Sequence, residues 1–244
     1  MPNPALARRR ATAVCGWETR TSSTFTTACP WARRWRSKRE PRRVDAAPLP
    51  DNLPAMTAVS TSYALLTVEE FLAAEPSYEV KHEYLGGMVY RVPEVRTPHV
   101  VISTNLCGAL GTRLRGRQCQ AFGSDMKARL AVSGTTYFYY PDAMIFCGTH
   151  GLGPSWCERP SVIFEILSDS TRSIDEREKR MAYLTLPSLD AYVRIEQDRR
   201  EVVIERRTNE GWQREVLAAD AVVSLPTVAV EFPVAELYER LPLA

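Results

Sequence analysis

The chain has 244 residues, of which 45% are hydrophobic and 25% are charged, and its formal net charge is +2. This composition is ordinary for a folded globular protein, and the length allows one large domain or one domain with a tail. No run approaches the roughly 18 apolar residues that a membrane-spanning helix needs, so we expect no membrane partner.

The net charge is divided unevenly along the chain. Residues 1–55 hold eleven Lys or Arg against four Asp or Glu, a charge of +7, which leaves 20 against 25, or −5, for the remainder. The first segment is rich in Arg, Thr, Ala and Pro without a helical or strand period, which is typical of a disordered tail. We therefore expect a disordered basic tail over 1–55 and a folded domain over 56–244. Translation from upstream of a true start at Met56 would explain the tail, and a nucleic-acid-binding arm is the alternative.

The six cysteines form no C-x-x-C pair. Two lie in the tail, and Cys107 and Cys147 stand within apolar patterns. This distribution excludes a zinc knuckle and predicts reduced, mostly buried thiols in a cytoplasmic protein.

The folded region opens with a predicted helix and a hairpin. Thr67 stands three residues before Glu70, the spacing of a capping box, and this predicts a short helix over 66–75. Residues 78–92 predict two strands on either side of a Gly-Gly turn.

A second helix is predicted over 97–116, with Thr97 as its N-cap and Pro98 at the first helical position. Apolar residues recur there at helical spacing: Val101, Leu106, Leu110 and Leu114. The same helix ends in a basic stretch over 112–117, which could supply contacts to phosphates.

Strand-like runs then occupy 119–123, 124–132, 135–147 and 160–168. Residues 148–159 are typical of a mobile loop. A helical pattern returns over 168–186, with an apolar face of Ile174, Met181 and Leu184. Three more strand-like runs and a short helix complete the chain: 191–198, 200–208, 211–218 and 234–241. This order predicts an α/β or α+β domain with a central mixed β-sheet flanked by helices.

Two acids stand where a charge should be costly. Asp142 follows Pro141 at the start of an apolar run, and Glu165 is the lone acid within the apolar strand of 160–168. An ionised carboxylate near a core needs compensation, and a metal ion is one candidate. Two carboxylates can hold a hard divalent ion that lowers the pKa of a bound water, and a lysine can offset charge on a phosphate. Glu83 in the hairpin and Lys179 on the helix after Glu165 complete the set.

This ordered set resembles the family of bacterial "putative restriction endonucleases", a branch of the PD-(D/E)XK nuclease superfamily. The likeness covers roughly residues 63–240 and is strongest at Pro141-Asp142, Glu165, the stretch 168–171, and Asp175 with Lys179. It implies a restriction-endonuclease-like core that hydrolyses DNA with Mg²⁺, for which Mn²⁺ can substitute, and with water as the nucleophile. A homodimer is one possible assembly.

The resemblance also implies roles for individual residues. Asp142 and Glu165 would bind Mg²⁺, and Glu83 would be an additional acid. The superfamily's E-x-K is absent, because Leu167 stands two residues after Glu165, where the lysine of the motif would be. Lys179 on the following helix is therefore the candidate for the catalytic lysine, and Lys127 is its competitor.

Each of these residues also has a plainer interpretation. Asp142 could be a turn residue, Glu165 half of a buried ion pair, and Glu83 a surface charge. Lys179 could pair with Asp175 on a helix surface, and His99 is more often a packing or capping residue than a ligand. The rival functions are a catalytically silent module that binds nucleic acid or another partner and a hydrolase of another phosphoester.

Overall fold

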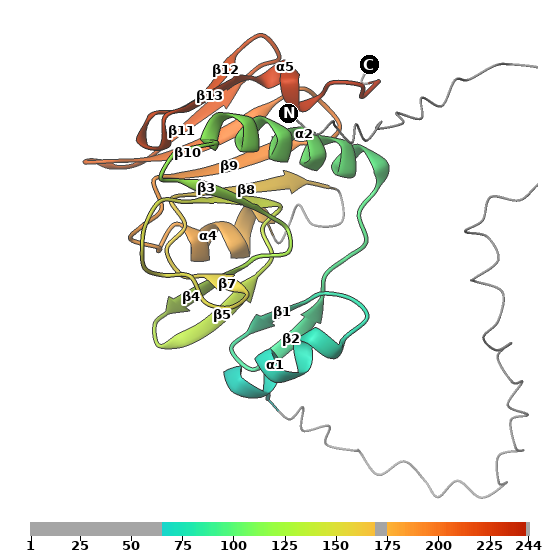
Figure 1. Ribbon diagram of the computed structural model, residues 1–244, viewed down its shortest axis with the longest axis vertical. Helices are drawn as coiled ribbons and strands as arrows, with labels where there is room; N and C mark the ends of the chain where they lie inside the picture. The colour runs from blue at the N-terminus through green and yellow to red at the C-terminus, as the bar shows by residue number, and fades with distance from the viewer. Residues whose placement is uncertain (1–64, 169–174, 243–244) are drawn as a thin grey trace, which may run out of the picture. The chain divides into compact units, whose positions relative to one another are not determined.

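The structure, a computed structural model, describes residues 65–168 and 175–242 (Figure 1). Their strands form three sheets, with few helices, and the fold class is mixed α+β as predicted. The tail of 1–55 and its boundary at Met56 lie outside the described residues and stay a prediction.

The largest sheet has six strands in the order β11-β10-β9-β8-β6-β3. These strands are β3 (Gln120–Gly123), β6 (Ala143–Phe146), β8 (Val162–Leu167), β9 (Ala191–Glu196), β10 (Val202–Thr208) and β11 (Gly211–Leu217). β8 and β9 run parallel and the other neighbours antiparallel, so the sheet is mixed. Every residue of β8 and β9 is buried, as expected for central strands covered on both faces.

A five-stranded sheet has the order β2-β1-β5-β4-β7. It contains β1 (His82–Leu85), β2 (Met88–Arg91), β4 (Lys127–Val132), β5 (Thr135–Tyr139) and β7 (Trp156–Cys157). β1 and β2 form the predicted hairpin. β7 lies within 148–159, the segment predicted to be a mobile loop, and pairs with β4. The prediction is therefore wrong for Trp156 and Cys157.

The run predicted as one strand over 135–147 is two strands in different sheets. β5 ends at Tyr139, and β6 begins at Ala143. Pro141 lacks the N–H that a sheet ladder requires, which favours an interruption there. Asp142 therefore lies where the chain passes from one sheet to the other.

The first two helices form where predicted, but the second ends at Leu114 and has Thr97, not Pro98, at its first helical position. Thr67 and Glu70 form the expected capping box before α1 (Val68–Ala74), and a short 3₁₀ turn (Glu75–Ser77) follows. α2 (Thr97–Leu114) has Arg96, not Thr97, at its N-cap. The Arg96 carbonyl already accepts a hydrogen bond from the N–H of Val100, so Thr97 belongs to the first helical turn.

The segment after β8 forms a π-helical turn (Asp175–Lys179) and then α4 (Arg180–Tyr183). Lys179 and Tyr183 are both buried, whereas Met181 is 68% exposed. The predicted apolar face is therefore wrong at Met181, because side chains four residues apart share a face and the residue midway between them does not. Ile174 and residues 169–171 lie outside the described residues.

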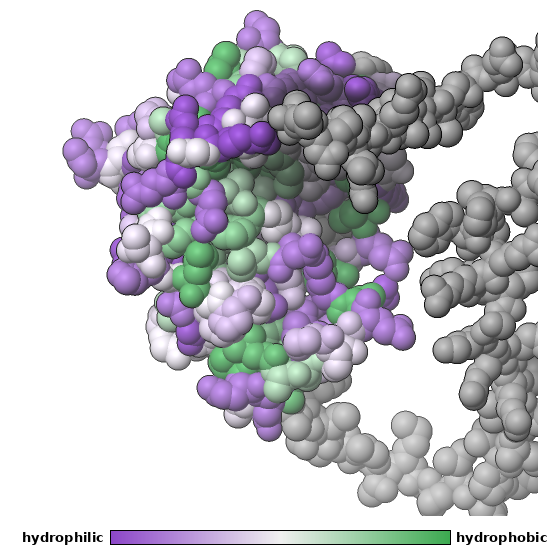
Figure 2. Space-filling view, viewed as in Figure 1, coloured by the Kyte–Doolittle hydropathy of each residue, from purple (hydrophilic) through white to green (hydrophobic). Residues whose placement is uncertain are grey.

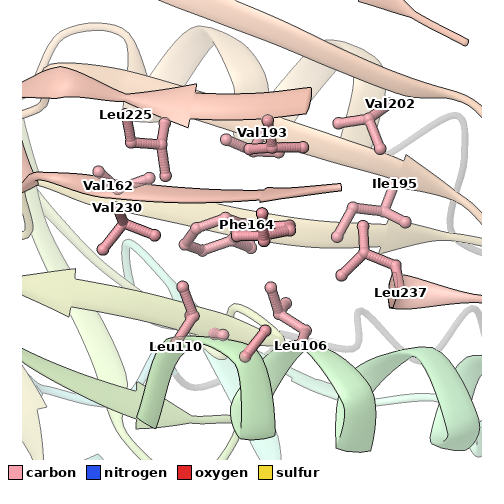
Figure 3. Packing of buried hydrophobic residues seen from close by; sticks show 14 of the residues in the cluster. Leu106, Leu110, Val162, Phe164, Val193, Ile195, Val202, Leu225, Val230 and Leu237 are labelled. Carbon is pink, nitrogen blue, oxygen red and sulfur yellow. The ribbon is translucent and has the colours of Figure 1, made fainter. Parts of the chain in front are cut away.

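The core lies on both faces of the six-stranded sheet. On one face, Leu106 and Leu110 of α2 pack with Val162 and Phe164 of β8 (Figure 3). A C-terminal hairpin and helix close this side: β12 (Val222–Leu225), a 3₁₀ turn (Pro226–Val228), β13 (Val230–Pro233) and α5 (Val234–Leu237). The sequence interpretation missed β12 and β13. On the other face, Ile163 packs with residues from β4, β5 and α4.

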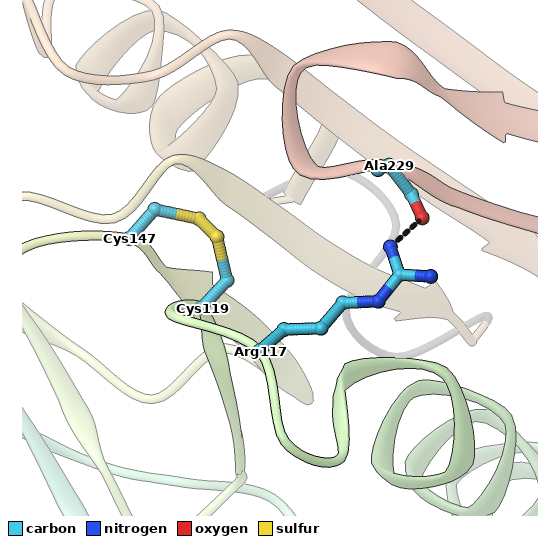
Figure 4. The surroundings of a disulfide bond; sticks show 4 residues. All are labelled: Arg117, Cys119, Cys147 and Ala229. Carbon is cyan, nitrogen blue, oxygen red and sulfur yellow. Dashed lines mark hydrogen bonds between the residues drawn. A yellow bond between two sulfur atoms is a disulfide. The ribbon is translucent and has the colours of Figure 1, made fainter.

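Two arginines of the basic stretch fasten the end of α2 to this C-terminal layer. Arg113 makes a bidentate ion pair with Glu236, at 2.7 and 2.8 Å. Arg117 donates to the Ala229 carbonyl at 2.6 Å (Figure 4). Both guanidinium groups therefore have structural partners, which weakens the interpretation of this stretch as a phosphate-binding patch.

Cys119 and Cys147 form a disulfide, with their Cα atoms 4.2 Å apart (Figure 4). Gln120 pairs with Phe146 in the β3–β6 ladder, so the cysteines that flank these two residues face each other. The prediction of reduced thiols is wrong for this pair. Cys107 and Cys157 are free, but Cys107 is exposed and only Cys157 is buried.

No helix within 65–168 or 175–242 is both long and apolar enough to cross a membrane. On the face shown in Figure 2, apolar side chains reach the surface in patches that polar side chains separate.

Candidate active site

Four predicted site residues line one cavity of about 70 Å³: Glu83, Asp142, Glu165 and Lys179. They come from β1, from the link between β5 and β6, from β8, and from the π-helical turn. His99 and Tyr140 line the same cavity. Residues far apart in the sequence thus meet at one cavity, next to the link that carries the chain from β5 of one sheet to β6 of the other.

Asp142 is held by two hydrogen bonds, one at each carboxylate oxygen. Nε2 of His99 lies 2.7 Å from Oδ1, and the backbone N–H of Ile166 donates to Oδ2 at 2.7 Å. Because Ala143 pairs with Phe164 in the β6–β8 ladder, the next step of this register places Asp142 beside Glu165. Strand pairing therefore explains why these two acids are neighbours, and the hydrogen bonds fix the orientation of Asp142.

Glu165 is 3% exposed, in accordance with its position inside an apolar strand. Its Oε1 accepts a hydrogen bond from the Tyr183 hydroxyl at 3.0 Å and lies 3.5 Å from Nζ of Lys179. A buried carboxylate with a cation and a donor at hand keeps its charge at a lower cost in free energy.

Glu83 reaches the same ammonium group from the hairpin. Its Oε1 lies 2.9 Å from Nζ of Lys179 and accepts the backbone N–H of Tyr140 at 3.1 Å. Lys179 is 7% exposed, so its charge is shielded from solvent. The plainer interpretations, a hairpin surface charge and a helix-surface lysine, do not describe these two side chains. The side chain of Asp175 lies outside the described residues.

Lys127 belongs to a second polar cluster behind Tyr140. Its Nζ donates to the Tyr140 hydroxyl at 3.0 Å, and that hydroxyl donates to Oε1 of Glu75 at 2.8 Å. Burial lowers the pKa of Lys127, while the charge of Glu75 opposes this effect. Lys127 is not among the residues that line the acid-rich cavity.

Three contributors to the site were not predicted from the sequence. His99 was assigned to packing or capping, and Tyr140 and Tyr183 were not singled out. Burial, and then the charge of Glu165, raise the pKa of Tyr183, so its hydroxyl stays protonated and acts as a donor. Tyr183 follows Lys179 by four residues, the spacing of one helix face, and this was the signal that could have found it.

The acids of this cavity are suited to a hard divalent ion. Mg²⁺ is usually bound by one or two carboxylates, with waters and substrate phosphates completing its shell. Asp142 and Glu165 offer two such groups on one cavity. Within 65–168 and 175–242 no three His, Cys, Asp or Glu side chains are placed to hold a metal ion together.

A family model matches most of the chain and defines the class of protein to which it belongs. The chain belongs to the Uma2 family, described as "Putative restriction endonuclease", whose model matches residues 68–235.

Two relatives from Synechocystis sp. match much of the chain. "Uncharacterized protein slr1290" is 26% identical over 184 residues, which are 75% of this chain and 96% of the relative. "Uncharacterized protein sll1609" is 30% identical over 149 residues, which are 58% of this chain and 80% of the relative.

A crystal structure described as "a putative nuclease belonging to DUF820", from Anabaena variabilis, has a similar fold. Its TM-score is 0.57 at 21% sequence identity, and the match covers 71% of this chain and 97% of that chain. At this identity the likeness shows the fold alone.

Proposed function

We propose that this protein is a Mg²⁺-dependent endonuclease that hydrolyses DNA phosphodiester bonds with a metal-activated water. The observation that carries the proposal is the meeting of Asp142, Glu165 and Lys179 at one cavity, although they come from separate segments. A structural protein gains little from gathering three mostly buried charges, whereas phosphodiester hydrolysis uses each of them.

Asp142 and Glu165 would hold the ion, and Mn²⁺ should replace Mg²⁺ because it also accepts oxygen ligands. When bound, such an ion lowers the pKa of a coordinated water and so supplies hydroxide near neutral pH. His99 fixes Asp142 through its 2.7 Å contact, so that the carboxylate is oriented before the ion arrives.

Lys179 would stabilise the negative charge that develops on the phosphate during attack. Its ammonium lies 3.5 Å from Oε1 of Glu165, so it is close to the candidate metal ligands and could stabilise that charge. Glu83 holds that ammonium at 2.9 Å, which makes Glu83 the residue that positions the lysine. The reaction needs a cation near the attacked phosphate. The lysine that supplies it can come from the strand of Glu165 or from the segment after that strand.

The rival is a catalytically silent module with the same fold that binds DNA or another partner. Supercoiled plasmid incubated with the full chain and Mg²⁺, Mn²⁺ or EDTA separates the two functions. We expect nicked and linear products with either ion and none with EDTA. Asp142→Asn, purified in parallel, controls for a contaminating nuclease. Intact plasmid with both ions, or equal cleavage by Asp142→Asn, would contradict the proposal.

A further inference from the structure

A second cavity, of about 330 Å³, shares no lining residue with the acid-rich cavity. Asp142 precedes β6 and Cys147 follows it, so the two cavities lie near opposite ends of this strand. At about 3.3 Å per residue, these ends are roughly 17 Å apart. We call the second cavity the Arg159 pocket, and its lining residues are Phe146, Cys147, Gly148, Thr149, His150, Arg159, Ser161 and Ser188.

The lining of the Arg159 pocket combines basic and hydroxyl side chains with no acid. Arg159 and His150 supply the basic groups, and Thr149, Ser161 and Ser188 supply the hydroxyls. Guanidinium and hydroxyl groups donate hydrogen bonds, and the guanidinium is also charged at every physiological pH. The pocket therefore favours an oxyanion over a cation or an apolar ligand.

The guanidinium of Arg159 is available to a ligand. Within 65–168 and 175–242 it makes no ion pair or hydrogen bond, and the neighbouring acid, Glu158, pairs with Arg129 instead. The stem of Arg159 packs against Gly151, where a Cβ atom would lie only 3.0 Å from Cγ of the arginine. The stem is thus held in place while the charged group has no protein partner.

Ser161 points to a ligand independently of the charge. It is 8% exposed, its N–H donates to the Ile145 carbonyl, and its own carbonyl accepts from the N–H of Asp190, both at 2.8 Å. These bonds fix the residue at the start of β8, but among the described residues its hydroxyl has no hydrogen-bond partner. Leaving a buried hydroxyl unpaired is costly, and an acceptor oxygen in the pocket would remove that cost.

We infer that the Arg159 pocket binds a phosphate group, at a site separate from the candidate active site. Arginine matches phosphate geometry through two parallel N–H···O bonds, and the Ser161 hydroxyl adds a further donor. The DNA backbone and a small phosphate compound both offer these oxygens, and the experiment below distinguishes them. The inference does not depend on the proposed cleavage reaction.

Three variants test the pocket. Arg159→Gln removes the charge, and Ser161→Ala removes the buried hydroxyl without changing any charge. Arg214→Gln is the matched control, because Arg214 is also exposed, has no side-chain partner within the part of the chain that the structure describes, and does not line the pocket. Circular dichroism verifies the fold of each variant.

The full chain is titrated in EDTA, at constant ionic strength, with inorganic phosphate and a deoxynucleoside 5′-monophosphate by calorimetry. A blunt DNA duplex is titrated by fluorescence anisotropy. We expect Arg159→Gln and Ser161→Ala each to weaken phosphate binding by at least about tenfold, the scale of losing a hydrogen bond to a charged group. Arg214→Gln should bind phosphate as the parent does.

The duplex identifies the source of the phosphate. If the pocket binds the DNA backbone, Arg159→Gln and Ser161→Ala should also weaken duplex binding more than Arg214→Gln does. If it binds a small compound, duplex affinity should be equal in the three variants while the loss for phosphate or the monophosphate persists.

Equal affinities of the three variants for all three ligands would overturn the inference, as would a parent that binds none of them. An effect of Arg159→Gln alone, with Ser161→Ala equal to the parent, would also overturn it, because general charge attraction then explains the binding. Since no divalent ion is present, a failure of the proposed cleavage leaves these outcomes unchanged.

Discussion

The ammonium of Lys179 lies 2.9 Å from Oε1 of Glu83, and both side chains are largely buried. This contact joins the β1–β2 hairpin to the segment that follows β8. Since Glu165 lies 3.5 Å from the same ammonium, one lysine links acids from both larger sheets. Removing the lysine should therefore affect the candidate site more than removing any other cation near it.

The first prediction concerns this lysine. Lys179→Met should lower the rate of plasmid nicking by about 100-fold or more, the scale of losing one electrostatic contact in the transition state. It should leave divalent-ion binding measurable, because the candidate ligands Asp142 and Glu165 are unchanged. Nicking rates at saturating Mg²⁺, with circular dichroism to verify the fold, provide the measurement.

Lys127→Met is the matched control, since Lys127 is also a buried lysine but hydrogen bonds to Tyr140. Its nicking rate should fall much less than that of Lys179→Met. The opposite ranking would assign the catalytic lysine to β4.

The second prediction concerns the metal ligands. Asp142→Asn and Glu165→Gln should each abolish Mg²⁺ binding in isothermal titration calorimetry, because each removes one of two carboxylates. Asp125→Asn is the control, at an acid whose side chain is 96% exposed, and should bind as the parent does. If all three variants bind Mg²⁺ equally, the ion is bound elsewhere.

The third prediction concerns His99, which positions Asp142. His99→Phe removes the contact to Oδ1 while keeping a ring of similar size. Mg²⁺ affinity should fall by about 10- to 100-fold, as is usual when the partner of a metal ligand is lost. An unchanged Mg²⁺ dissociation constant would indicate that His99 serves in packing and does not position a metal ligand.

Much of the fold could be predicted from local patterns. The capping box at Thr67, the hairpin turn and the apolar strand around Glu165 each depend on residues adjacent in sequence, and each is present. The oddity of an acid in that strand also indicated Glu165 as a site residue. Local patterns are informative here because strands and caps are defined by neighbouring side chains.

The features of the fold and site that were not predicted depend on which strands pair, and strand pairing cannot be inferred from a local sequence pattern. The run over 135–147 has the pattern of one continuous strand, yet its halves belong to different sheets. The partner of His99 could not be identified without knowing that the start of β6 lies beside α2. The link between Cys119 and Cys147 likewise follows from the β3–β6 register.

The fourth prediction concerns that disulfide. The two cysteines are separated by 28 residues, and closing a loop of this length should stabilise the fold by about 3–4 kcal/mol through the unfolded chain. A Cys119→Ser/Cys147→Ser variant should therefore unfold at lower urea concentration. Cys107→Ser, at an exposed free cysteine, is the control and should unfold as the parent does. Identical midpoints for the parent with and without reductant would argue against a stabilising bond.

The last prediction concerns Tyr183, whose hydroxyl donates to Glu165 at 3.0 Å. Burial, and then the charge of Glu165, raise its pKa above 10.0, so the folded protein keeps this proton at pH values where the unfolded chain loses it. Because ionisation then favours the unfolded chain, the stability linked to Tyr183 is complete below pH 10 and declines above it. At pH 8, Tyr183→Phe should lower the free energy of unfolding by about 1–3 kcal/mol, the scale of losing one hydrogen bond to a charged acceptor. This difference should shrink between pH 9 and pH 11 in urea titrations, whereas Tyr90→Phe, at an exposed tyrosine, should match the parent throughout. A difference that stays constant with pH would mean that the phenol of Tyr183 ionises as readily in the folded protein as in the unfolded chain.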